Sequence, residues 1–166
     1  LDNASLEFIY NETLGFAEMY LNDVNVEKSI RSLEVSNLVS KVSAIPEVRK
    51  KLVAIQKEIG KNKAVVMDGR DIGSVVFTDA ELKIFMTSSA ETRAQRRYDE
   101  LIQKGEKVSY QDVYTNVVER DRVDTSRKDS PLVKADGAIE IDNSQLSKEK
   151  QFEIILKLVE EKLRDI

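Results

Sequence analysis

The 166-residue sequence contains no cysteine and no histidine. Without cysteine, disulfide bonds and thiolate metal sites are excluded. Without histidine, the chain has neither a histidine general base nor a zinc site built on imidazoles. Any chemistry must therefore come from carboxylates, guanidinium groups, amino groups and hydroxyls.

Long apolar runs and a strong excess of one charge are also missing. No apolar run approaches the length of a membrane span and no signal peptide is visible, so we expect a cytoplasmic protein. The formal net charge of -4 argues against unspecific binding to nucleic acid or membranes. A small anionic ligand senses only the local field and stays compatible with this charge. The chain begins with Leu1 and not with methionine, and we expect it to be a fragment.

The first part of the sequence predicts a β-hairpin followed by two helices. Residues 6–10 and 16–21 alternate between apolar and polar side chains, and residues 11–15 between them are typical of a turn. Residues 27–44 have helical periodicity. A second helix is predicted to begin at Pro46 and to end at Gly60.

The remainder alternates predicted strands with predicted helices. The strands are expected at residues 64–67, 82–86 and 138–142. Helices are expected to start at the capping serines Ser88 and Ser109, and a last helix covers residues 148–163. This order favours an α/β fold with a parallel sheet flanked by helices. Three strands are few for such a sheet, which fits a missing N-terminal piece.

The most informative segment is residues 68–73, which read Asp-Gly-Arg-Asp-Ile-Gly and directly follow the first predicted strand. In open α/β sheets, ligands bind at the carboxyl ends of strands. Glycine lets the backbone approach a ligand, and the Arg70 guanidinium offers a planar fork to a phosphate. We interpret the segment as a nucleotide site. The alternative is a turn stabilised by an ion pair between Arg70 and Asp71.

Residues 119–129 carry eight charges in eleven positions, four of each sign. On a helix, Arg120, Asp124 and Arg127 would share one face. One interpretation is a mobile flap that brings arginine onto a phosphate. The other, favoured by the segment alone, is a solvated helix with surface ion pairs. Arg93, Arg96 and Arg97 are likewise more typical of surface charges when considered alone.

Taken together, residues 30–35, 39–49, 67–77, 119–127 and 130–132 resemble, in this order, the bacterial-type cytidylate kinases. The resemblance implies a P-loop kinase-like α/β fold. Residues 1–60 would hold the CMP-binding insert and its following helix, and residues 61–166 the rest of the core with a helical lid at about 95–129. The family transfers a phosphoryl group from ATP, with Mg²⁺, to CMP or dCMP. The expected partners are these nucleotides, and we expect a monomer.

The resemblance also implies roles for individual residues. Three positions match residues that contact the cytosine ring: Ser40, Arg49 and Asp71. An aspartate carboxylate can accept from the cytosine amino group, whereas uracil presents a carbonyl there. Taken singly, Ser40 could instead bond back to its own helix, and Arg49 could be a plain surface charge.

The remaining matches concern the phosphates and the sugar. Arg70 and Arg127 correspond to arginines that hold the CMP phosphate, and Arg120 and Asp124 to residues near the sugar. Arg96 and Arg97 correspond to lid arginines near the ATP phosphates, so the catalytic set is Arg70, Arg127, Arg96 and Arg97. Asp68 is a candidate to orient Mg²⁺ through water.

The chain departs from the family in its phosphate loop. None of its six glycines forms the pattern Gly-x-x-x-x-Gly-Lys-[Ser/Thr], and Val123 and Thr125 stand where some relatives carry arginine. That loop cradles the ATP phosphates. We therefore expect an active parent protein and an inactive 166-residue chain. The alternatives are another small-molecule P-loop kinase, for dephospho-coenzyme A or shikimate, and a non-catalytic nucleotide-binding or interaction module.

Overall fold

The computed structural model describes residues 4–62 and 64–164. The chain divides into two compact units, Leu1–Leu52 and Val53–Ile166, and each is described by itself. Within the described ranges, no helix has both the length and the apolar character needed to traverse a bilayer.

The first unit contains a three-stranded antiparallel sheet in the order β1-β2-β3. The predicted hairpin is confirmed, because β1 (Leu6–Asn11) pairs with β2 (Phe16–Leu21). Asn11 organises the turn, since its side-chain oxygen accepts from the amides of Thr13 and Leu14 at 3.0 and 3.2 Å. The short strand β3 (Val24–Asn25) was not predicted. A two-residue turn with both φ angles positive connects it to β2.

Two helices follow the sheet. The predicted helix at residues 27–44 is shorter than expected: a 3₁₀ turn (Ser29–Arg31) precedes α1 (Leu33–Ser43). The Ser32 hydroxyl starts α1 by accepting from the amide of Val35 at 3.3 Å. The helix predicted at Pro46 is confirmed as α2 (Pro46–Ile59), and the division between the two units falls within it.

The strand predicted at residues 64–67 is wrong. These residues are not in a strand, Ala64 has a positive φ of 53°, and Val66 is fully exposed. A strand is held by hydrogen bonds to a neighbouring strand, and in the described part of the chain none pairs with this segment. Apolar composition alone had indicated the strand. The chain continues through residues 68–71 into a π-helical turn, η2 (Ile72–Val76), which the sequence did not predict.

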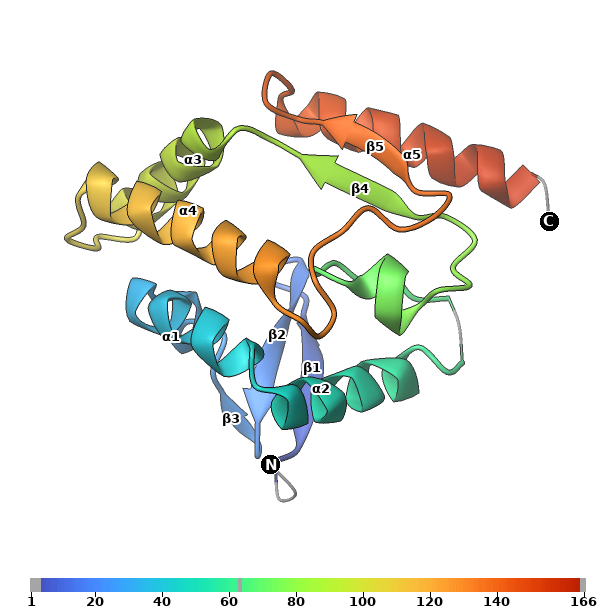
Figure 1. Cartoon of the computed structure of the whole chain (residues 1–166), viewed down its shortest axis with the longest axis horizontal. Coiled ribbons are helices and arrows are strands. Elements are labelled where there is room, and N and C mark those ends of the chain that lie inside the picture. The colour runs from blue at the N-terminus through green and yellow to red at the C-terminus, as the bar shows by residue number, and fades with distance from the viewer. Residues whose placement is uncertain (1–3, 63, 165–166) are drawn as a thin grey trace. The chain divides into compact units, whose positions relative to one another are not determined.

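The second unit contains the parallel strands β4 (Ile84–Thr87) and β5 (Ile139–Asp142). Their register pairs Ile84 with Ile139 and Thr87 with Asp142, so the two carboxyl ends are adjacent (Figure 1). The helices are α3 (Ala90–Gln103) and α4 (Tyr110–Ser126), which pack against each other, and α5 (Lys148–Arg164). The predicted α/β organisation, a parallel sheet accompanied by helices, is confirmed in this coarse form.

Helix caps explain where α3 and α4 begin. The Ser109 hydroxyl accepts from the amide of Asp112 at 3.1 Å, which confirms the predicted cap of α4. The cap of α3 is Ser89 and not the predicted Ser88, because the Ser89 hydroxyl accepts from the amide of Thr92 at 3.1 Å. Among the described residues, the buried apolar side chains of the helix pair are Ala94, Leu101 and Val113.

Candidate functional site

A buried carboxylate surrounded by arginines lies at the end of α4. Asp124 is only 2% exposed. Its Oδ2 faces Nε of Arg70 at 3.2 Å and Nε of Arg120 at 3.8 Å, and its Oδ1 accepts from Nη1 of Arg127 at 3.0 Å. We call these four residues the Asp124 cluster. The structure thus brings together four of the predicted site residues, from the segment before η2, from α4 and from its C-terminal cap.

Helix geometry explains three of the four positions. Arg120 precedes Asp124 by four residues, and Arg127 follows it by three, so both side chains reach the same carboxylate. Arg127 leaves the helix as its cap, with extended backbone, and its Nε donates to the carbonyl of Ser130 at 2.6 Å. The amide of Leu132 donates to the carbonyl of Asp124 at 2.8 Å. The chain after α4 is therefore folded back onto the helix end.

The Asp124 cluster has an excess of positive charge. Three guanidinium groups face one carboxylate, which leaves a formal charge of +2 (three positive minus one negative). The pKa of Arg120 is lowered by burial and, next, by the positive charge of Arg70. Arginine remains protonated at neutral pH, so the crowded cations stay charged. An anion that enters here would relieve their mutual repulsion, which makes the cluster suitable for a phosphate.

The arginines of α3 have different surroundings. Arg97 pairs with Glu100 at 2.8 Å, and its charge lowers the pKa of Arg120 further, after burial and Arg70. Arg96 lies elsewhere: its guanidinium donates to the side chain and carbonyl of Asn143 at 3.0 and 2.7 Å and to the carbonyl of Leu146 at 3.3 Å. Arg96 therefore supports the connection between β5 and α5.

Asp71 and Asp68 stand on either side of Arg70. Asp71 is 7% exposed, and its carbonyl accepts from the amide of Val75 at 2.9 Å at the start of η2. Asp68 is exposed. Over the described residues, no group of three or more acidic side chains is placed to hold a metal ion. A Mg²⁺ ion would thus depend on phosphate oxygens and water, as is usual for this cation, with at most one or two carboxylates.

The two remaining predicted residues belong to the first unit. Arg49 is half-buried on α2, and its Nη1 donates to the carbonyl of Ser43, at the end of α1, at 3.3 Å. Ser40 lies in α1, but its side chain falls outside what the structure describes.

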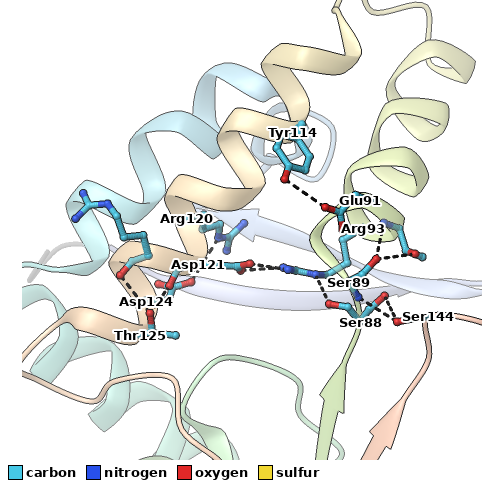
Figure 2. Close-up of polar contacts among 12 residues, drawn as sticks. Ser88, Ser89, Glu91, Arg93, Tyr114, Arg120, Asp121, Asp124, Thr125 and Ser144 are labelled. Atoms are coloured by element: carbon cyan, nitrogen blue, oxygen red, sulfur yellow. Dashed lines mark hydrogen bonds and ion pairs between the residues drawn. The ribbon is translucent and has the colours of Figure 1, made fainter.

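Sequence reasoning missed one strong contact near the Asp124 cluster. Arg93 on α3 binds Asp121 on α4 with two hydrogen bonds, at 2.8 and 2.5 Å (Figure 2). Residues 119–129 contain four carboxylates. Of these, helical spacing placed only Asp124 on the same face as two arginines. The signal that the sequence did contain was Asp121 on α4 together with an arginine near the start of the preceding helix.

Comparisons with known proteins agree on one family. The family model described as cytidylate kinase matches residues 2–161. The chain is 69% identical to the cytidylate kinase of Flavobacterium johnsoniae over 159 residues, covering 96% of this chain and 69% of the relative. It is 66% identical to that of Flavobacterium psychrophilum over 159 residues, covering 96% of this chain and 70% of the relative. Identity to the Cytophaga hutchinsonii cytidylate kinase is 43%, over 100% of this chain and 71% of that protein.

Proposed function

Because this chain belongs to the cytidylate kinase family, we propose that its protein transfers the γ-phosphoryl group of ATP to CMP or dCMP, giving ADP and CDP or dCDP. The observation that supports this proposal best is the Asp124 cluster. It presents an excess of positive charge, partly buried, from residues that the family resemblance assigns to the acceptor nucleotide.

The acceptor phosphate is bound by Arg70 and Arg127 in this proposal. Asp124 holds both guanidinium groups in place before the ligand arrives, so little side-chain ordering remains for the binding step. Arg120 and Asp124 also reach the sugar, where a carboxylate can accept from a ribose hydroxyl. Neutralisation and alignment of the acceptor are what phosphoryl transfer chiefly requires of a protein.

Recognition of the base is assigned to Asp71, Ser40 and Arg49. Asp71 accepts from the exocyclic amino group of cytosine. Its burial strengthens this selection, because two acceptor oxygens that face each other there would find little water to hydrogen-bond with. Uracil places a carbonyl opposite the carboxylate and is disfavoured. Ser40 and Arg49 keep the roles that the resemblance gives them, as contacts to the ring.

For the donor nucleotide, we propose that Arg97 and Arg96 approach the transferred phosphoryl group when the lid closes. The three hydrogen bonds of Arg96 to Asn143 and Leu146 would have to be exchanged in that step. Mg²⁺ on the ATP phosphates would supply charge neutralisation, and Asp68 is the carboxylate proposed to hold one of its water ligands.

We also propose that the 166 residues alone do not catalyse transfer, because they contain no Gly-x-x-x-x-Gly-Lys-[Ser/Thr] loop. The turnover of CMP by this chain, compared with that by the cytidylate kinase of Flavobacterium johnsoniae, tests this point. Equal turnover would contradict it.

The proposed function is tested by the substitution Arg70→Lys in a form of the protein that turns over CMP. Lysine retains the charge but loses the planar fork, so kcat/KM for CMP should fall by roughly ten- to a hundredfold, the effect of losing about 1.5–3 kcal/mol from a charged hydrogen bond. Glu119→Gln, which changes an exposed carboxylate of α4, serves as the control. Unchanged kcat/KM in the Arg70 variant would remove Arg70 from the acceptor site. Turnover of UMP or AMP in preference to CMP would refute the proposed function itself.

A further inference from the structure

Arg93 lies outside the Asp124 cluster but connects three structural elements next to it. The residue is in the first turns of α3. Its Nη1 and Nη2 donate to the two carboxylate oxygens of Asp121 on α4, and its Nε donates to the carbonyl of Ser88, just after β4, at 3.2 Å. Figure 2 shows the side chain extended between these partners. One guanidinium group therefore joins the end of β4, α3 and α4.

The Arg93–Asp121 pair has the features of a strong contact. It is forked, with two parallel hydrogen bonds, and the side chains are only 33% and 28% exposed. The hydrogen bond from Arg93 to Asp121 raises the pKa of Arg93. Forked pairs of arginine and carboxylate fix geometry as well as contributing energy. By contrast, the forked pair of Arg122 with Glu119 lies within α4 and is mostly exposed.

The position of Asp121 on α4 relates the pair to the Asp124 cluster. Asp121 directly follows Arg120 and precedes Asp124 by three residues, about one helical turn. Holding Asp121 thus fixes both the rotation and the axial position of this turn of α4. Arg70 approaches from a separate segment, so its 3.2 Å contact with Asp124 depends on where that turn lies.

We infer that Arg93 is a positioning residue for the acceptor phosphate: through Asp121 and the Ser88 carbonyl it sets α4 so that Arg120 and Asp124 meet Arg70. The identity of the ligand rests on the proposed function, whereas the geometric role does not.

The kinetic test uses Arg93→Lys, Asp121→Asn and the double variant in a form of the protein that turns over CMP. Each single change should raise KM for CMP about tenfold, the middle of the range for coupled residues, with a much smaller effect on KM for ATP. The double variant should be no worse than either single variant, because the pair acts as a unit. Arg122→Lys, which disturbs the exposed pair of the same helix, should leave both KM values unchanged.

A structural readout separates this inference from the proposed function. Proton–nitrogen NMR without nucleotide follows the exchange of the Arg70 Nε–H with water. Exchange should be faster in Arg93→Lys and Asp121→Asn, because the contact with Asp124 loosens, and unchanged in Arg122→Lys.

The two readouts decide the matter together. If the unmodified protein neither binds nor turns over CMP, the proposed function fails and the NMR result alone decides the role of Arg93. Arg70 exchange that is unchanged in both variants overturns the inference. It is also overturned if the variants lose thermal stability while KM for CMP stays at the unmodified value, or if both KM values rise equally.

Discussion

At the residue scale, the Asp124 cluster separates what the sequence could and could not predict. Helical spacing placed Arg120, Asp124 and Arg127 on one face, and the structure confirms that they meet. The contact between Arg70 and Asp124 joins residues that lie 54 positions apart (124 minus 70), and no local sequence pattern predicts it. The family resemblance placed Arg70 and Asp124 in one site, whereas physical reasoning from the residues alone did not. The partner of Asp121 was missed for the same reason.

Asp124→Asn should lower the free energy of unfolding by about 3–5 kcal/mol, because it removes the buried carboxylate that pairs with the buried guanidinium group of Arg127. Urea unfolding, followed by circular dichroism, measures the change. Glu119→Gln on the same helix is the control and should leave the unfolding midpoint where it is, since its ion pair is exposed. A midpoint for Asp124→Asn equal to that of the unmodified protein would mean that the Asp124 cluster does not stabilise the fold.

Asp71→Asn should reduce the preference for CMP over UMP by roughly five- to 150-fold, because a base contact of this kind discriminates by about 1–3 kcal/mol. The asparagine amide can donate to the uracil carbonyl, which the carboxylate cannot do. The ratio of kcat/KM for the two nucleotides measures the effect. If the ratio stays at its original value, Asp71 does not read the base.

At the element scale, the sequence predicted what local chemistry determines. The hairpin, the helix beginning at Pro46 and the cap at Ser109 depend on neighbouring residues, and all are confirmed. The strand at residues 64–67 failed because strand formation needs a partner elsewhere in the chain. The cap of α3 was misplaced by one residue, since either adjacent serine could serve. The backbone carbonyl of Ser88 is instead bonded to Arg93.

Gly105→Ala should destabilise the protein by about 1 kcal/mol. Gly105 ends α3 with a φ of 79°, its amide donates to the carbonyl of Ile102, and the amide of Glu106 donates to that of Leu101. This arrangement is a Schellman motif, which requires a left-handed residue. Gly105→Asn should have a smaller effect, because asparagine tolerates that conformation better. Thermal unfolding compares the two, and an alanine variant at least as stable as the asparagine variant would contradict the assignment.

At the scale of the whole molecule, total charge and local charge have opposite signs. The chain carries a formal charge of -4, whereas the Asp124 cluster carries +2 (three arginines minus one aspartate). Composition therefore argued against unspecific binding to polyanions and stayed compatible with a small phosphate ligand. The sequence could show the overall balance, but the local excess required knowledge of which charges meet in space.

Binding of CMP should weaken with salt far more than binding of cytidine, which lacks the phosphate. Between about 0.01 M and 1 M ionic strength the screening length falls from about 30 Å to about 3 Å, so the attraction of the Asp124 cluster for the phosphate is reduced. Calorimetric titrations at several salt concentrations measure both affinities. Parallel salt dependence for CMP and cytidine would show that the phosphate does not experience the field of these arginines.

The most direct test of the acceptor site is a crystal structure of the protein with CMP bound. We expect phosphate oxygens within hydrogen-bonding distance of Arg70 and Arg127, with Asp124 still buried between the guanidinium groups. A CMP phosphate bound away from both arginines, in a protein whose Asp124 cluster is intact, would contradict the central claim.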